Sequence, residues 1–429
     1  MTALEKHVDV AVIGGGPAGI SACLELVKVP GIRIALFESE AELGGMPRCC
    51  HVFFGMRDMK RLYSGPQYAR KLSQLVRKTR VDIHTNATAL QIIEGKEKSR
   101  HLVKIATPEG LITCKCKYLL LATGCFESSR ESRRIPGTRP AGIYTTGSLQ
   151  QVVNLQKLKP GRKALILGSE NVAFSAALTL HRAGIKIAGL VSEDSRLQTY
   201  PLAAKAISIA MGFKIFDDTD IENIFGKKRV EGATLIRRSD RRSFEIDCDT
   251  VVCTGKFRPD AALIYQTSIA EDQDSRGPLV DMNYMTSSPR IFAAGNVLRG
   301  ADMHDICALE GRQVAVRILD HRRGNELNDT NRVTLSVSAP LRYAVPQVIF
   351  LNRARTTRTS CWSPGVSVQS ALTLKRVTIE AWSGDRKLYS KRCSRLIANS
   401  RFPLQVERFD WEKADLSKPI MIKVVEDQF

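Results

Sequence analysis

The feature that most constrains the fold of this chain is a run of glycines that joins a predicted strand to a predicted helix near the N-terminus. Residues 8–13 form a mostly apolar stretch typical of a buried strand, and residues 20–27 continue as an apolar helix. The residues between them are Gly14, Gly15, Gly16, Pro17, Ala18 and Gly19, which fit the pattern G-x-G-x-x-G. A strand, a turn of this kind and a helix together predict a Rossmann-type unit that binds a dinucleotide.

The spacing of these glycines has a physical reason. Gly14 permits the tight turn out of the strand, Gly16 lacks a Cβ and lets the backbone approach a pyrophosphate, and Gly19 lets the helix pack closely on the strand. The helix N-terminus offers N–H groups and a partial positive charge to the phosphates. Glu38 ends the next strand, residues 32–37, and is expected to accept hydrogen bonds from the adenosine ribose. The alternative is a glycine-rich turn that holds no ligand.

Two later segments indicate which dinucleotide the first site binds. Residues 119–124 are an apolar strand that ends in A-T-G, and residues 291–296 read I-F-A-A-G-N. In this order the segments resemble the A-T-G and F-A-x-G-D strands of the pyridine nucleotide-disulfide oxidoreductase superfamily, over residues 1 to about 325. Asn296 takes the place of the family's Asp, which lies against the ribityl chain of FAD, and its amide can still bond a hydroxyl. The resemblance implies that FAD is held by Gly14, Gly16, Pro17, Ala18, Gly19, Glu38, Gly45, Ala122, Thr123, Gly124, Gly295 and Asn296.

The predicted fold class is α/β, with two Rossmann-like domains of the FAD/NAD(P)-binding type followed by a small all-β C-terminal domain. The FAD-binding domain is expected to be discontinuous, with residues 1–125 plus 259–325, and residues 126–258 form the NAD(P)-binding-like domain. In residues 330–429 apolar and polar side chains alternate, as they do in strands, so we expect a β-rich domain there.

The second dinucleotide motif departs from the pattern. After the apolar strand 164–167, Glu170 stands where the middle glycine belongs, whereas Gly168 and Ala173 keep the turn and the packing. The Cβ of Glu170 would block close approach, and its carboxylate would repel a pyrophosphate by about 1 to 4 kcal/mol. We therefore expect the Rossmann-like fold to persist and NAD(P) not to bind in the ordinary way.

The amino-acid sequence in the middle of the chain resembles one branch of the superfamily. Residues 122–125, 135–137 and 140–147 resemble the FAD-containing subunits of multi-subunit dehydrogenases, such as those of opine oxidase, hydroxyproline or proline dehydrogenase and hydrogen cyanide synthase. The chain, including its β-rich C-terminal segment, also resembles oxidoreductases associated with glycerol 3-phosphate metabolism. The resemblance implies a partner dehydrogenase subunit and a small substrate, namely an amine, an amino acid or a polyol phosphate.

Three residues are candidates for a catalytic role near the flavin. His304 begins a helix whose N-terminus, in the superfamily, points at the flavin. Cys50 and His51 follow Gly45, but Cys49 is directly adjacent to Cys50, which opposes the spaced redox-active pair of the disulfide reductases. For each of the three, the alternative is a structural or buried role.

The net charge and the cysteine pattern argue against nucleic-acid-binding and metal-binding functions. The net charge is +20, without aromatic residues interleaved as in nucleic-acid binding, so no nucleic-acid partner is expected. The basic surface is compatible with solvation alone, an acidic partner, an anionic substrate or peripheral membrane association. The eleven cysteines include no C-x-x-C motif, so no metal site is predicted. No signal peptide is recognised in the N-terminal residues, and a cytoplasmic location is expected.

Three functions remain open from the sequence. The first is the flavin-bearing subunit of a multi-subunit dehydrogenase. The second is a self-contained NAD(P)H-dependent flavin reductase, which requires NAD(P)H to bind despite Glu170. The third is a non-catalytic nucleotide-binding scaffold subunit.

Overall fold

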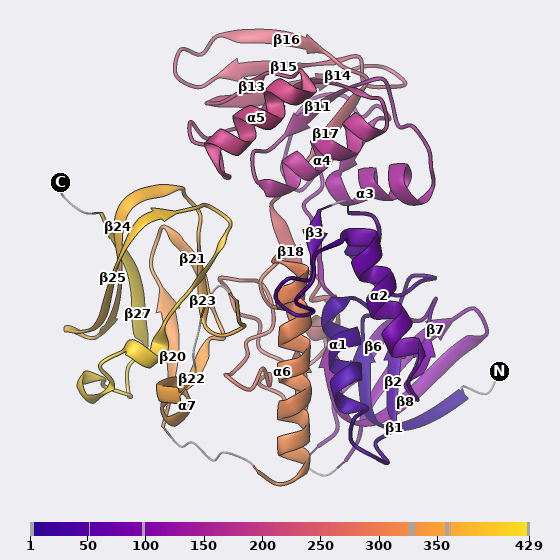
Figure 1. Ribbon diagram of the computed structural model, residues 1–429, viewed down its shortest axis with the longest axis vertical. Coiled ribbons are helices and arrows are strands. Elements are labelled where there is room, and N and C mark those ends of the chain that lie inside the picture. The colour runs from indigo at the N-terminus through magenta and orange to yellow at the C-terminus, as the bar shows by residue number, and fades with distance from the viewer. Residues whose placement is uncertain are drawn as a thin grey trace.

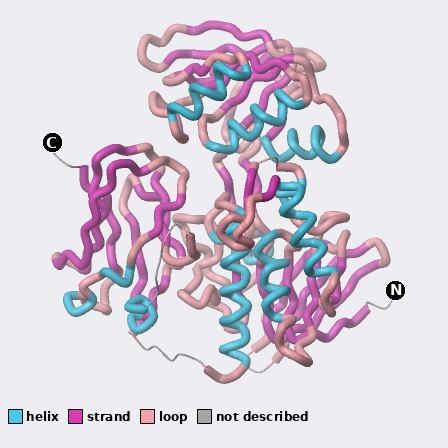
Figure 2. The backbone as a smooth tube through the Cα atoms, viewed as in Figure 1, coloured by secondary structure: helices cyan, strands magenta, loops and turns pink. Residues whose placement is uncertain are grey.

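The computed structural model describes residues 4–50, 52–96, 99–325, 331–356, 360 and 362–426. Three parts are visible in Figure 1: one around α1, α2 and α6, one above it around α3, α4 and α5, and a strand-rich C-terminal part beside them. Helices and strands alternate in the first two parts, whereas strands dominate the third (Figure 2). Within the described residues, no helix has the length and apolar character needed to cross a membrane.

The first part is built on a seven-stranded sheet with the order β5-β2-β1-β8-β7-β6, in which β19 also pairs with β8. Its parallel strands are β1 (Leu4–Ile13), β2 (Ile34–Phe37), β5 (Asp82–His84), β8 (Gly110–Leu121) and β19 (Ile291–Ala293). The antiparallel strands are β6 (Thr88–Ile93) and β7 (His101–Thr107). The buried run at the end of β1 explains its central place, because a strand covered on both faces must be apolar throughout.

Helices α1 (Pro17–Leu26), α2 (Gly65–Arg77) and α6 (His304–Arg322) belong to the same part. A Cβ added at Gly311 of α6 would lie 2.0 Å from the carbonyl oxygen of Ala18, so α1 and α6 pack backbone against backbone. The pair β3 (Phe53–Phe54) and β4 (Tyr63–Ser64) precedes α2. Since β19 and α6 return to the first sheet after the second part, the first part is discontinuous in sequence.

The second part has a five-stranded parallel sheet with the order β10-β17-β11-β12-β13. Its strands are β10 (Ile143–Thr145), β11 (Lys163–Leu167), β12 (Lys186–Val191), β13 (Ile215–Phe216) and β17 (Thr250–Cys253). Its helices are α3 (Thr146–Gln150), α4 (Asn171–Arg182) and α5 (Pro201–Met211). A smaller antiparallel sheet is made of β14 (Thr219–Phe225), β15 (Gly232–Arg237) and β16 (Ser243–Asp247). As expected, the turn after β11 keeps the Rossmann geometry despite Glu170.

Two chain crossings connect the first and second parts. They pair with each other as the antiparallel strands β9 (Cys125–Glu127) and β18 (Phe257–Pro259). Both crossings follow directly on strands, β8 and β17, so the carboxyl edges of the two parallel sheets face the connection. Ligands of open α/β sheets bind at such carboxyl edges.

The C-terminal part contains a five-stranded sheet, β22-β20-β27-β24-β25, and a three-stranded sheet, β21-β23-β26. The strands are β20 (Arg332–Val337), β21 (Leu341–Val345), β22 (Val348–Phe350), β23 (Ser367–Ser370), β24 (Leu374–Ser383), β25 (Arg386–Leu396), β26 (Arg401–Pro403) and β27 (Ile420–Glu426). One short helix, α7 (Leu351–Thr356), accompanies them. β24 and β25 form a hairpin whose turn lies between Ser383 and Arg386, and Val377, Ile379 and Ala381 are fully buried.

Candidate functional site

The glycine turn after β1 leaves open space at one position and close contacts at two others. Gly14 has a φ of +108°, and a Cβ there would lie 2.3 Å from the carbonyl oxygen of Ala122. A Cβ at Gly19 would lie 2.0 Å from the carbonyl oxygen of Gly14. At Gly16, the N-cap of α1, no atom would lie within 4 Å of an added Cβ. The turn is therefore tight where helix and strand meet and open where a pyrophosphate would approach the helix N-terminus.

Glu38 lies beside this turn at the end of β2. Its side chain is 7% exposed, and its carboxylate accepts hydrogen bonds from the N–H groups of Gly15 at 2.7 Å and Glu40 at 2.8 Å. The oxygen bonded to Glu40 also accepts from the Ser39 hydroxyl at 3.2 Å, whereas the oxygen bonded to Gly15 retains a lone pair that can accept from a ribose hydroxyl. The carboxylate is fixed in place by backbone contacts, which is the arrangement expected of an acceptor that positions a ligand.

The loop that carries Gly45 closes on the same turn. Gly45 has a φ of 60° and a ψ of −153°, and its Cβ position would lie 3.1 Å from the Cα of Gly16. On the other side, Thr123 donates from its hydroxyl to the carbonyl of Asp260 at 2.6 Å. Gly124, with a φ of +85°, has open space where a Cβ would be. The predicted cofactor residues of three segments therefore converge at one edge of the sheet.

Asn296 follows β19 at that edge. Its side-chain oxygen accepts from the N–H of Asp302 at 3.0 Å and from the thiol of Cys307 at 3.1 Å, and the thiol of Cys125 also contacts the side chain. An aspartate at this position could make the same acceptor contacts, which explains how the amide replaces it without rearranging the loop. The residues present fit FAD, because Gly16 is open to a pyrophosphate, Glu38 can accept beside the same turn, and Asn296 bonds the N–H of Asp302 just before α6.

A buried network of ion pairs lies next to Asn296. Arg299 and Glu310 form an ion pair and are 5% and 1% exposed. Asp302 lies 3.1 Å from the same guanidinium, and Glu310 accepts from the N–H of Gly295 at 3.1 Å. Burial alone would lower the pKa of Arg299, but Glu310 and Asp302 raise it well above its usual value. Sequence reasoning missed this network, although a glutamate on the apolar face of the helix at residues 306–318 is a detectable signal.

The candidate catalytic residues are placed differently from one another. His304 begins α6 and packs against the ring of Phe54, with centroids 4.7 Å apart. Burial lowers the pKa of His304 to about 4, so its imidazole is neutral at pH 7 and is not a ready proton donor in its charged form. His51 lies outside the described residues.

Cys50 lies between the two parts, and its thiol is 3.6 Å from the hydroxyl of Ser175 on α4. Burial raises the pKa of Cys50, and it raises the pKa of Cys49 to about 12. Both groups therefore remain thiols at neutral pH, whereas dithiol relays need a thiolate. Ten described cysteines are free of disulfides, these two included.

The turn after β11 repeats the geometry of the first turn with a different occupant. Gly168 has a φ of +136°, and Glu170 is the N-cap of α4 with φ −80° and ψ 171°, close to the φ −80° and ψ −173° of Gly16. This backbone conformation suits any residue, so Glu170 introduces no strain. Its carboxylate folds back and accepts from the N–H of Ser169 at 3.0 Å. The side chain thus fills space beside Gly168 and Gly255 in the second turn, whereas no atom lies within 4 Å of a Cβ at Gly16 in the first.

A second carboxylate closes the same region. Glu127, on β9, accepts from the N–H groups of Gly147 at 2.7 Å and Gly255 at 3.2 Å. A Cβ at Gly255 would lie 2.8 Å from the carboxyl carbon of Glu170, so both acidic groups meet at Gly255. Burial, with the neighbouring Glu170 acting in the same direction, raises the pKa of Glu127 to about 7. Sequence reasoning did not single out Glu127, because only the fold brings β9 beside the second turn.

Fold and site together define an α/β protein with two Rossmann-like turns, the first open at Gly16 and the second filled by Glu170. The chain belongs to the pyridine nucleotide-disulphide oxidoreductase family, which it matches over residues 8–317. Members of this family are FAD-dependent oxidoreductases, and FAD is the cofactor of this chain.

Comparisons with individual proteins agree with this assignment. The chain is 31% identical over 186 residues to hydrogen cyanide synthase subunit HcnB of Pseudomonas protegens, which covers 42% of this chain and 37% of that protein. It is 24% identical over 344 residues to the NADPH glutamate synthase small chain of Escherichia coli, covering 72% of this chain and 68% of that protein. The chain thus spans little more than a third of the length of the first relative.

Solved structures show the same architecture. The thioredoxin reductase of T. acidophilum superposes with a TM-score of 0.63 at 18% identity, covering 74% of this chain and 99% of that one. The L-proline dehydrogenase of P. horikoshii superposes with a TM-score of 0.57 at 23% identity, covering 75% of this chain and 57% of that one. At these identities the similarity establishes the fold alone.

Proposed function

We propose that this chain is the flavin-bearing subunit of a multi-subunit dehydrogenase that oxidises a small amine, amino acid or polyol phosphate, and that NAD(P)H is not its electron donor. The observation that carries the proposal is the position of Glu170. Glu170 is the N-cap of α4, and its carboxylate accepts from the N–H of Ser169 within the turn where the pyrophosphate of NAD(P) would bind. Glu127 adds a second carboxyl group at Gly255. Burial raises the pKa of both groups, that of Glu127 to about 7, so the two side chains oppose a pyrophosphate by filling the space and by the negative charge that they retain.

The first turn differs from the second in the space at its helix N-cap. Gly16 leaves the corresponding space open, and Glu38, Gly45 and Asn296 surround it. Bound FAD supplies an acceptor for two electrons from an organic substrate. The protein holds that cofactor, positions α6 behind it, and excludes the usual reductant from the second turn. A flavin cut off from NAD(P)H needs another substrate or subunit to reduce it, and this requirement supports a partner.

The relatives are consistent with a subunit role. One of them is a subunit of hydrogen cyanide synthase and another is the small chain of glutamate synthase. Since the chain matches only part of the former, its substrate and partner are part of the proposal.

Calorimetry on the FAD-loaded chain tests the proposal. We expect neither NADH nor NADPH to bind at millimolar concentration, because Glu170 and Glu127 fill the space at the second turn and disfavour the negatively charged pyrophosphate there. Tight binding of either nucleotide would favour a self-contained NAD(P)H-dependent flavin reductase. Steady-state oxidation of an amine, amino acid or polyol phosphate by the purified chain alone would contradict the need for a partner.

A further inference from the structure

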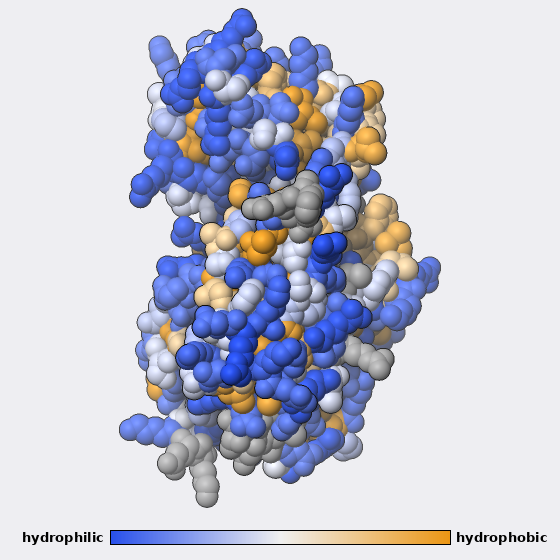
Figure 3. Space-filling model, turned by 90° about the vertical axis from the view of Figure 1, so that its left-hand side faces the viewer, coloured by the Kyte–Doolittle hydropathy of each residue, from blue (hydrophilic) through white to orange (hydrophobic). Residues whose placement is uncertain are grey.

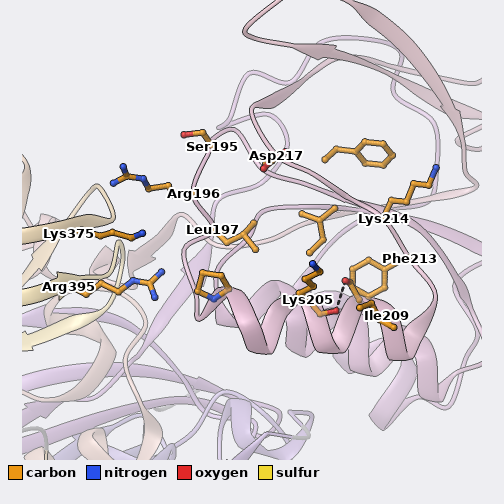
Figure 4. A pocket seen from close by; sticks show the side chains of 14 residues that line it. Ser195, Arg196, Leu197, Lys205, Ile209, Phe213, Lys214, Asp217, Lys375 and Arg395 are labelled. Atoms are coloured by element: carbon orange, nitrogen blue, oxygen red, sulfur yellow. Dashed lines mark hydrogen bonds between the residues drawn. The ribbon is translucent and has the colours of Figure 1, made fainter.

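A cavity of about 590 Å³ lies between the second part and the C-terminal part, away from both dinucleotide turns. Its walls come from α5 and the loop before it on one side, and from β24 and β25 on the other (Figure 4). Cavities of this size accommodate drug-sized small molecules. Neither the FAD site nor the turn at Glu170 contributes residues to it.

The lining of this cavity carries an excess of positive charge. Its cations are Arg196, Lys205, Lys214, Lys375 and Arg395, and its acidic side chain is Asp217. Figure 4 shows the side chains of Arg196, Lys375 and Arg395 near one another at the left of the space, with Lys205 and Lys214 to the right. Clustered charges of one sign repel one another and concentrate counter-ions in the cleft between them.

These cations are not neutralised within the part of the chain that the structure describes. None of the five forms an ion pair with a described carboxylate, although many other surface cations of the chain do. Arg395 donates one long hydrogen bond, of 3.5 Å, to the carbonyl of Thr199. α5 begins at Pro201 in the lining, so the partial positive charge of its N-terminus adds to the field.

The rest of the lining is apolar. Leu197, Ile209, Phe213 and Phe216 contribute to it, and the exposed surface of the cavity is more apolar than polar. Ile209 is 71% exposed, which is costly for a side chain of this kind unless something covers it. Figure 3 shows the side of the molecule on which the C-terminal part lies, and hydrophilic residues cover most of it. An apolar floor beneath a ring of unpaired cations is therefore a local feature.

We propose that this cavity binds a small molecule that carries phosphate groups on an aromatic or aliphatic body. The phosphates contact Arg196, Lys375 and Arg395 at the mouth, since guanidinium groups bind phosphate oxygens in pairs of hydrogen bonds. The body covers Phe213 and Ile209. Because the ligand touches both parts, it links the second part to the C-terminal part. The proposal is independent of how the flavin is reduced.

Calorimetric titration of the FAD-saturated chain with ADP tests this assignment, because bound FAD already fills the first dinucleotide turn. We expect one binding site that weakens at least tenfold in the double variant K375A/R395A. The matched control is R386A/R392A, which removes two arginine charges from exposed positions of β25 outside the cavity and should change the affinity less than twofold. Equal weakening in both doubles, or no binding to the wild-type chain, would overturn the proposal.

Two further probes distinguish the ligand class. Pyrophosphate has the charged groups without the body, and we expect it to bind at least tenfold more weakly than ADP; equal or tighter binding would overturn the assignment of the apolar floor. Vesicles containing phosphatidylglycerol present phosphates on a membrane surface, and we expect no cosedimentation at about 0.15 M salt. Cosedimentation that is lost in K375A/R395A would assign the cavity to lipid and contradict a small-molecule ligand.

Discussion

At the scale of single residues, the two dinucleotide turns differ by what stands at the helix N-cap. Gly16 and Glu170 have nearly the same backbone conformation, and only the side chain changes what each turn can hold. The Glu170 carboxylate accepts from the N–H of Ser169, the residue before the N-cap, and not from the first turn of α4. Its side chain therefore fills part of the second turn, while the first turn stays open at Gly16.

Replacing Glu170 by glycine should open the second turn. The E170G variant is expected to bind NADH or NADPH at least tenfold more tightly than the wild-type chain, because the like-charge repulsion of about 1 to 4 kcal/mol and the steric block both disappear. Fluorescence titration of the FAD-loaded protein measures this. E131G, which removes an exposed carboxylate, is the control and should leave the affinity unchanged. An unchanged affinity in E170G would show that Glu170 is not what excludes the nucleotide.

Asn296 offers a second residue-scale prediction. N296A removes the acceptor of the Asp302 N–H and the Cys307 thiol and is expected to weaken FAD binding about tenfold, the effect of a lost hydrogen bond and a loosened loop. N296D keeps both acceptor contacts and should retain wild-type affinity. Flavin release in dialysis, followed by absorbance, measures both; equal affinity in N296A and the wild type would mean that the amide does not support the cofactor.

At the scale of secondary-structure elements, α6 is held in register by charges rather than by apolar packing alone. The ion pair of Arg299 and Glu310 connects the loop after β19 to the second turn of α6. Arg401 of β26 lies 3.8 Å from Asp302 in the same loop. The same network thus joins the flavin-facing helix to the C-terminal part. Buried ion pairs contribute little net stability but cost much when one partner is removed.

Truncating one partner of this network should be strongly destabilising. E310A leaves Arg299 buried beside Asp302 alone, and we expect a loss of about 3 kcal/mol in the free energy of unfolding. The double variant R299M/E310M removes both charges and should recover most of that loss. Urea unfolding of the two variants at pH 7 measures the difference. E310A and the double variant being equally stable would contradict a coupled pair.

The sequence predicted some of these features and missed others for physical reasons. The roles of Gly14, Gly16 and Gly19 follow from backbone geometry that a motif encodes locally, and the structure has the contacts and the space that those roles require. The direction of the Glu170 side chain is a tertiary property, because it depends on Gly255 from a distant strand. The sequence analysis expected its carboxylate to meet a pyrophosphate, whereas the carboxylate lies folded against its own turn.

Long-range pairings were equally beyond local patterns. Glu127 reaches the second turn only because β9 pairs with β18 at the connection between the two parts. The basic cavity depends on β24 and β25 lying beside α5, which composition alone does not reveal. The strands of the C-terminal part were predictable from alternation, since that pattern is local.

At the scale of the whole molecule, stability is linked to pH through histidines that the fold keeps neutral. His101 on β7 is fully buried, and its Nδ1 accepts from the N–H of Gly95 at 3.1 Å. Burial, with the neighbouring Arg290 acting in the same direction, lowers its pKa from a usual value of 6.5 to about 4. Between pH 6.5 and about pH 4 the imidazole of His101 is therefore protonated in the unfolded chain and neutral in the folded chain. The folded state loses stability as the pH falls through this range.

The variant H101N isolates this contribution. Its amide oxygen can accept from Gly95 and does not titrate, so the wild-type chain should lose more stability than H101N between about pH 6.5 and 4. Above pH 7 the two proteins should respond to pH in parallel. Urea unfolding at several pH values measures this, with the exposed H181N as the control. Parallel curves below pH 6.5 would show that His101 is protonated normally in the fold.

An anaerobic visible spectrum of the FAD-loaded protein shows whether NAD(P)H reduces the flavin of this chain. After addition of millimolar NADH or NADPH, we expect the flavin absorption band to persist for many minutes, because Glu170 and Glu127 fill the second turn. Rapid bleaching of the band by either nucleotide would show that NAD(P)H reaches the flavin and would establish a self-contained reductase.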